Sequence, residues 1–289
     1  MKYKDELHHT RLSRLVKGMS LRRETVAPAL IFGILAFGIY VFLAVADEIA
    51  EGEIREFDER FFLLFRDDAD PSRILGPAWL QETMVELTAL GGYPIIILTL
   101  IAVVGLLLVT RRYGPALFTF VSVWFGWLIS HFLKQFYDRP RPDLVEHLDT
   151  VHTASFPSGH AMMSTVIYLT LAALVVRFFD DTRVRVYVIC VAVFIAGLVG
   201  LSRIYLGVHW PSDVIAGWAL GAAWASFLWL VITLMHTVGR RSSDTASQDR
   251  AAQAAPSAQP ASTSLGQWTP RKMRLSPTAR AIAIATAKT

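Results

Sequence analysis

The stretch SFPSGH (residues 155–160) stands directly before a long apolar run, residues 161–178. A helix that only crosses a bilayer needs no such polar entrance, so this junction indicates a site at the start of the apolar helix. Pro157 stiffens the entry, Ser158 can cap the helix, and Gly159 lets a ligand approach the backbone closely. Because a helix start has unpaired N–H groups and a positive dipole end, this one suits an anion such as phosphate.

The last residue of the stretch, His160, would point into the same space. An imidazole can give or take a proton near neutral pH, so His160 is a candidate proton donor or acceptor. The alternative for this segment alone is a plain helix cap with an incidental histidine.

The composition of the whole chain predicts a membrane protein. The chain has 289 residues, of which 53% are hydrophobic and only 18% are charged, and its mean hydropathy is +0.42. Those values are too apolar for an ordinary soluble domain. A bilayer span takes about 20 apolar residues, and the blocks that reach or approach this length are residues 26–46, 93–109, 115–133, 161–178, 184–201 and 214–235. The sequence therefore predicts an all-α bundle of six transmembrane helices.

The first block has a second interpretation. Ala44-Val45-Ala46 before Asp47 resembles the small-residue cleavage site of a secretory signal peptide. However, 25 residues precede the block and the block is longer than a usual signal core, which favours a membrane span.

Lysine and arginine placement predicts the orientation in the membrane. The first 25 residues hold seven basic residues, and the connection 47–92 instead carries twelve acids against four arginines. Further basic pairs follow the second, fourth and sixth blocks, namely Arg111 and Arg112, Arg183 and Arg185, and Arg240 and Arg241. We expect a multi-pass protein of the plasma (inner) membrane with both termini in the cytoplasm. The net charge of +4 reflects this sidedness and does not indicate nucleic-acid binding.

Three regions follow from these patterns. Residues 1–25 form a basic cytoplasmic tail, residues 26–236 form the membrane domain, and residues 237–289 are predicted to be a disordered cytoplasmic tail rich in Ser, Ala, Gln and Pro. The one cysteine, Cys190, excludes an internal disulfide, and we expect it to pack as a small residue.

The outer connection 47–92 contains two apolar stripes at helical spacing. They predict short amphipathic helices at the membrane surface, which either cap the bundle or guide lipid inward. Asp58 is one of the polar residues between the members of the first stripe. The stripes are Ile54, Phe57, Phe61 and Leu64, and then Leu80, Met84, Leu87 and Leu90.

Unusual polar residues gather at the outer end of the predicted bundle, in three groups that are far apart in sequence. His209 and Asp213 are spaced i, i+4, so they share a face if the helix has begun by His209. A carboxylate on one imidazole nitrogen fixes the tautomer and leaves the other nitrogen nucleophilic. The alternatives are membrane-interface anchors and a salt-linked helix cap. The groups are Lys134, Asp138, Arg139 and Arg141; then Ser158, Gly159 and His160; and finally Ser202, Arg203, His209 and Asp213.

Metal binding is the competing chemistry. His160, His209 and Asp213 could form a ligand set of two histidines and one carboxylate. Lys134, Arg141 and Arg203 at the same end would repel a divalent cation, and the planar fork of an arginine suits phosphate oxygens. The surplus of cations favours an anionic substrate, and we expect no metal or other cofactor.

The same residues carry a resemblance to a known family. Residues 134–142 fit K-x6-R-P, residues 157–160 fit P-S-G-H, and residues 202–213 fit S-R-x5-H-x3-D. In this order the three motifs resemble the type 2 phosphatidic acid phosphatases, or lipid phosphate phosphatases, which are related to vanadium haloperoxidases. The ordered trio is highly specific, and no motif position departs from the pattern.

The resemblance implies a role for each motif residue. His209 would attack phosphorus and form a phosphohistidine, Asp213 would orient it, and His160 would protonate the leaving oxygen. The phosphate oxygens would be held by Lys134, Arg141, Ser158, the Gly159 N–H and Arg203.

The implied enzyme is a metal-independent phosphatase with its site on the extracytoplasmic face. The substrate would be a lipid phosphate in the bilayer: phosphatidate, phosphatidylglycerol phosphate or undecaprenyl diphosphate. The residues leave two alternatives open, namely a phosphotransferase on the same scaffold and a non-enzymatic lipid-phosphate binder or transporter. Both histidines and Asp213 argue against simple binding, because binding would need only the cations.

Overall fold

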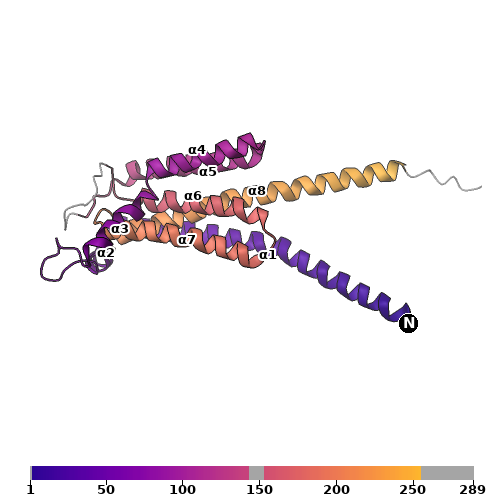
Figure 1. Ribbon diagram of the computed structural model, residues 1–289, viewed down its shortest axis with the longest axis horizontal. Helices are drawn as coiled ribbons and strands as arrows, with labels where there is room; N and C mark the ends of the chain where they lie inside the picture. The colour runs from indigo at the N-terminus through magenta and orange to yellow at the C-terminus, as the bar shows by residue number, and fades with distance from the viewer. Residues whose placement is uncertain (1, 143–152, 255–289) are drawn as a thin grey trace, which may run out of the picture. The chain divides into compact units, whose positions relative to one another are not determined.

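The computed structural model describes residues 2–142 and 153–254, and the regular structure in these residues is helical apart from one isolated bridge between Arg66 and Ile74. Figure 1 shows the helices labelled along the chain. A short 3-10 turn, Val176–Phe178, extends α6. The helices are α1 (Lys2–Glu51), α2 (Arg55–Leu63), α3 (Ala78–Ala89), α4 (Tyr93–Val109), α5 (Tyr113–Tyr137), α6 (Gly159–Val175), α7 (Thr182–Tyr205) and α8 (Pro211–Ala254).

Five helical segments are long and apolar enough to cross a bilayer, and a bent pair of helices is a candidate sixth. The pair is α3 followed by α4, with a 45° bend between them. The protein is therefore an all-α membrane protein with five to six candidate spans among its described residues. The five single spans are Pro28–Glu51, Tyr113–Tyr137, Gly159–Phe178, Thr182–Tyr205 and Pro211–Met235.

Helix α6, which follows the SFPSGH stretch, is the most enclosed of these spans. Its span is 61% buried, against 17% to 33% for the other four. It packs against α5 and α7, while α4 packs against α5 and α3 against α7. Helix α8 also approaches α6 closely, since a Cβ at Gly217 would lie 2.7 Å from the Ser158 carbonyl oxygen and one at Gly221 would lie 2.8 Å from that of Met162. Small residues at such contacts let helix backbones meet.

The two amphipathic stripes of the outer connection are helical, as predicted, but they face different surroundings. Leu80 and Met84 of α3 pack against the end of α7 and the turn that follows it. In α2 the buried residues are Asp58 and Phe62, whereas Phe57, Phe61 and Leu64 of the expected apolar face are exposed. The placement of Asp58 on the polar side was thus wrong, because this carboxylate has buried partners elsewhere in the chain.

The terminal regions differ from the expected tails. Helix α1 already begins at Lys2, and α8 continues through Arg241 to Ala254, so residues 237–254 are helical and not disordered. The physical reason is that Ala, Gln and Arg favour helix and here extend an existing helix, which avoids the cost of nucleation. Residues 255–289 of the predicted tail lie outside the described residues. Cys190 is exposed on α7, so the packing role expected for it was also wrong.

Candidate active site

His209 and Asp213 meet at the turn between α7 and α8. Both side chains are buried, and the His209 Nδ1 lies 3.4 Å from the Asp213 Oδ2. Helix α8 begins only at Pro211, so the pair spans the helix start instead of lying on one helical face. The Trp210 N–H donates to the Asp213 Oδ2 (3.0 Å) and closes the turn between them. We assign the Nδ1–H tautomer to His209, because Nδ1 faces a carboxylate and Nε2 faces a cation.

The cation beside Nε2 is Arg141. Its Nη1 lies 3.3 Å from the His209 Nε2 and donates to the Val208 carbonyl (2.5 Å), and its Nε donates to the Thr153 carbonyl (2.9 Å). The chain turns toward this position after α5 ends at Tyr137, because the C-cap residue Asp138 adopts a left-handed backbone conformation (φ 40°). Arg141 therefore stands where a group bonded to Nε2 would carry negative charge.

Lys134 and Arg203 are the other two predicted cations, and both are buried. The Lys134 Nζ donates to the Ala154 carbonyl (2.6 Å). The Arg203 Nη1 donates to the Thr88 Oγ1 (2.9 Å), from α7 to α3. These bonds go to neutral oxygens, so they orient the two cations without cancelling their charge.

The pKa of His209 shows that the predicted groups act on one another. Burial lowers this pKa well below its ordinary value, and the charges of Lys134, Arg141, Arg203 and His160 lower it further. At neutral pH the imidazole is therefore uncharged, with a lone pair on Nε2. An anion bound among the cations would offset their effect on the imidazole.

The SFPSGH stretch forms the opposite side of the site. The Ser158 Oγ accepts a hydrogen bond from the Ala161 N–H (3.5 Å), so the predicted N-cap is confirmed. The Ser158 N–H donates to the Asp213 carbonyl (3.0 Å), which ties the start of α6 to the start of α8. His160 lies beside the turn between α3 and α4, because a Cβ on Gly92 would be 3.8 Å from the His160 Nε2.

Gly159 leaves a gap between three side chains. A Cβ built on it would lie 3.5 Å from the Lys134 Cε, 3.5 Å from the Tyr93 Oη and 3.7 Å from the Ser130 Oγ. The structure thus brings Lys134 of α5 to the same helix start as Gly159, as the interpretation of this start as an anion site requires.

Three residues of the site were not among the predicted catalytic or phosphate-binding residues, although Arg139 stood in the first polar group. The Ser155 Oγ donates to the Asp213 Oδ2 and lies 3.3 Å from the His209 Nδ1. Arg139 donates from Nη1 to the Asp213 Oδ1 (2.6 Å) and from Nη2 to the Asp58 Oδ2 (2.7 Å). Ser155 and Arg139 stand next to motif residues, which is a signal that could have found them. Asp58 has no such signal, since it lies among other charged residues of the outer connection.

The same contacts weigh against a metal centre built on His160, His209 and Asp213. Arg139 occupies the Oδ1 of Asp213, while Ser155 and Trp210 donate to its Oδ2. A carboxylate engaged in this way has little capacity left for a metal ion, and neighbouring cations oppose one.

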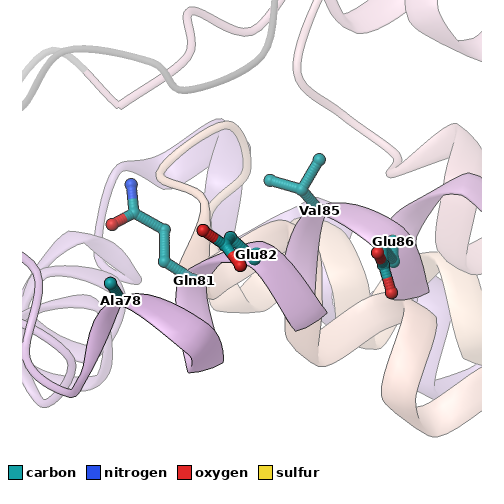
Figure 2. Close-up of a pocket in the computed structure, with 5 residues that line it drawn as sticks. All are labelled: Ala78, Gln81, Glu82, Val85 and Glu86. Carbon is teal, nitrogen blue, oxygen red and sulfur yellow. The ribbon is translucent and has the colours of Figure 1, made fainter.

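A surface pocket of about 550 Å³ lies elsewhere, along α3. Figure 2 shows the side chains that line it, which all come from this one helix: Ala78, Gln81, Glu82, Val85 and Glu86. Its two carboxylates make it unsuitable for a phosphate. The buried cluster around His209 is the better candidate site.

Fold and site together describe a helical membrane protein in which a buried histidine–aspartate pair lies beside a cluster of cationic side chains. The sequence profile described as the PAP2 superfamily matches residues 115–235, which include every predicted site residue. The chain is 32% identical over 186 residues to phosphatidylglycerophosphatase B of Bacillus subtilis, covering 62% of this chain and 85% of that protein. It is also 36% identical over 124 residues to lipid A 1-phosphatase of Rhizobium johnstonii, covering 40% and 46% of the two chains.

A solved structure agrees with these matches. It is the crystal structure of the first transmembrane PAP2 type phosphatidylglycerolphosphate phosphatase from Bacillus subtilis, with a TM-score of 0.58 and 27% identity. The similarity covers 66% of this chain and 94% of the other. The chain belongs to the PAP2 superfamily, and it is a membrane lipid phosphatase of that family.

Proposed function

We propose that the chain removes phosphate from a phospholipid through a phosphohistidine intermediate on His209. The observation that carries this proposal is the environment of the two imidazole nitrogens: Nδ1 faces Asp213, and Nε2 stands beside Arg141. A neutral imidazole fixed in this way has its lone pair directed toward the place where cations would hold a phosphate.

In the first step the Nε2 lone pair of His209 attacks phosphorus, and the bond from phosphorus to the lipid oxygen breaks. His160 gives its proton to that oxygen, so that the lipid leaves as an alcohol. Asp213 accepts a hydrogen bond from the His209 Nδ1–H and stabilises the positive charge that develops on the imidazole. Lys134, Arg141 and Arg203 stabilise the charge on the phosphate oxygens, with the Ser158 hydroxyl and the Gly159 N–H as further donors.

In the second step water attacks phosphorus and the bond from phosphorus to Nε2 breaks. His160, now without its proton, takes one proton from the water, and inorganic phosphate leaves. Both histidines thereby return to their starting states. The step needs no metal, because the cations supply the charge stabilisation.

Phosphatidylglycerol phosphate is the first candidate substrate. The relative with the highest coverage reported above is named a phosphatidylglycerophosphatase, and this chain spans 85% of its length. Phosphatidate and undecaprenyl diphosphate carry the same terminal phosphoryl group and remain the comparison substrates, although the diphosphate would leave as a lipid phosphate and not as an alcohol.

For the membrane arrangement we propose six spans, with α4 as the second and with α2 and α3 at the outer surface. The exposed Phe57, Phe61 and Leu64 of α2 support contact with the lipid interface. The lysine and arginine bias supports cytoplasmic termini and an extracytoplasmic site. An Asp68→Cys variant in a Cys190→Ser background should react with an impermeant maleimide in intact spheroplasts, whereas Tyr113→Cys should react only after permeabilisation. The reverse pattern would show that the orientation is inverted.

The activity is tested with detergent-purified protein and the three lipids. Phosphate release should be fastest from phosphatidylglycerol phosphate, should persist in EDTA, and should be blocked by vanadate, which mimics phosphate. Activity lost in EDTA and restored by magnesium would contradict the metal-free mechanism. Phosphate transfer to an added alcohol in place of release would favour the phosphotransferase.

A further inference from the structure

A buried chain of charges joins the outer helix α2 to the His209–Asp213 pair. Asp58 is 1% exposed and Asp213 is fully buried, and the guanidinium of Arg139 bridges them, 2.7 Å from the Asp58 Oδ2 and 2.6 Å from the Asp213 Oδ1. Ser212 closes the arrangement, since its N–H donates to the Asp58 Oδ1 (2.8 Å) and its hydroxyl to the Asp58 Oδ2 (2.6 Å). The Arg139 Nη1 also donates to the Ser212 Oγ (2.8 Å). Both carboxylates therefore have fixed orientations.

Burial of this kind is costly for a carboxylate. Desolvation raises the pKa of Asp58, and hydrogen bonds from Ser212 and Arg139 oppose that rise. Attachment of α2 alone would not require such a group, because Phe62 already packs α2 against Trp210, with 5.7 Å between ring centroids. The charge of Asp58 thus calls for an explanation beyond docking of the helix.

The shared guanidinium has an electrostatic consequence for Asp213. If Asp58 were absent, Arg139 and Asp213 would form a neutral ion pair. Such a pair would stabilise a positively charged His209 imidazole poorly. Because Asp58 shares Arg139, two negative charges face one positive charge, and the cluster stays negative next to His209. Arg139 on Oδ1 also leaves Oδ2 turned toward the His209 Nδ1.

We propose that Asp58 of α2 is a positioning residue of this active site, which acts through Arg139 to keep Asp213 oriented and negative against His209. The inference rests on the proposed nucleophilic role of His209. It gives the first outer connection a part in catalysis through Asp58, whereas the other acidic residues of α2, Glu56 and Glu59, are exposed or half-buried.

The test compares Asp58→Asn with a matched control on the same helix. Asparagine keeps the shape of the side chain and removes its charge, and Glu56→Gln makes the same change at an exposed position. Partners that orient metal ligands from outside contribute about 10- to 100-fold in activity, and we take the same range for a partner that orients Asp213. We expect Asp58→Asn to lower kcat by about that factor with KM changed by less than about threefold, and Glu56→Gln to leave both constants unchanged.

Two further readouts separate positioning from folding. The Asp58→Asn and Arg139→Gln changes should be non-additive in kcat, because they act through one network. The acidic limb of the kcat/KM profile against pH, which we assign to His209, should move to lower pH in Asp58→Asn. Loss of a nearby negative charge disfavours the His209 imidazolium and so lowers the pKa of His209. The groups that face this imidazole are Asp213, Ser155, Arg141, Lys134, Arg203 and His160.

Unchanged kcat in folded Asp58→Asn protein would overturn the inference, as would a loss that only follows the folded fraction measured by thermal unfolding. A rise in KM at constant kcat would also overturn it, because it would indicate substrate binding. Activity that survives His209→Ala would instead overturn the proposed function, so the two failures are distinguishable.

Discussion

The two halves of the chain contribute to the site in different ways. Helices α5 to α8 and their connections, from Tyr113 onward, carry all eight predicted site residues. Helices α1 to α4 supply Asp58, which bonds Arg139 and Ser212 beside Asp213, and Thr88, which bonds Arg203. The second half thus provides the groups that would meet the phosphate, and the first half provides groups that hold them in place.

The sequence distances of the contacts show the same difference. His209 and Asp213 are four residues apart, so one turn of chain brings them together. Ser212 and Asp58 are 154 residues apart, and Arg203 and Thr88 are 115 residues apart. A short sequence motif can predict a contact between residues that are close in sequence. A contact between distant residues depends on the packing of whole helices. We therefore expect substitutions in the second half to remove catalysis and those in the first half to weaken it.

His209→Ala gives the largest expected effect. Without Nε2 there is no nucleophile, so turnover should fall for every substrate, whatever its leaving group. Removal of a catalytic nucleophile costs on the order of 10⁶-fold in kcat. The measurement is phosphate release together with trapping of an acid-labile phosphoenzyme, and a phosphoenzyme that persists in His209→Ala would show that another residue attacks.

His160→Ala should have a smaller effect that depends on the leaving group. General acid catalysis contributes about 10²- to 10⁴-fold, so kcat/KM should fall by about that factor for a lipid phosphate whose alcohol must be protonated. A lipid-like p-nitrophenyl phosphate ester releases p-nitrophenolate, a stable anion that needs no proton, so the fall in kcat/KM for that substrate should be distinctly smaller. Equal losses on the two substrates would contradict the role of His160 as the acid.

The sequence predicted the second half better than the first for a physical reason. Apolar blocks located the candidate spans to within a few residues, since a lipid environment requires such blocks, although α1 and α8 extend well beyond theirs. The SFPSGH stretch predicted the capped start of α6, because capping depends on residues next to one another. The bend between α3 and α4 and the burial of Asp58 could not be predicted, because both depend on helices that are distant in sequence.

The helical course of residues 237–254 was missed for a different reason. A composition rich in Ser, Ala, Gln and Pro was taken as disordered, yet Ala and Gln also continue a helix that already exists. The roles of the eight site residues stay predictions until the variants are measured.

Thr88→Val should give the smallest effect of the three and comes from the first half of the chain. Its hydroxyl accepts the hydrogen bond of the Arg203 Nη1 (2.9 Å), and valine keeps the shape but removes the acceptor. A hydrogen bond to a charged group contributes about 1.5–3 kcal/mol, but Arg203 has other interactions, so we expect a loss near the lower limit, about tenfold in kcat/KM.

Thr88→Ser restores the hydroxyl and should regain most of the activity. Thr83→Val is the matched control on α3, because the Thr83 hydroxyl donates within its own helix, to the Trp79 carbonyl (2.7 Å). If Thr83→Val lowers kcat/KM as much as Thr88→Val does, the loss comes from α3 itself and not from Arg203. A loss at Thr88 as large as that of His160→Ala would break the distinction between the two halves, since a first-half residue would then act in the chemistry itself.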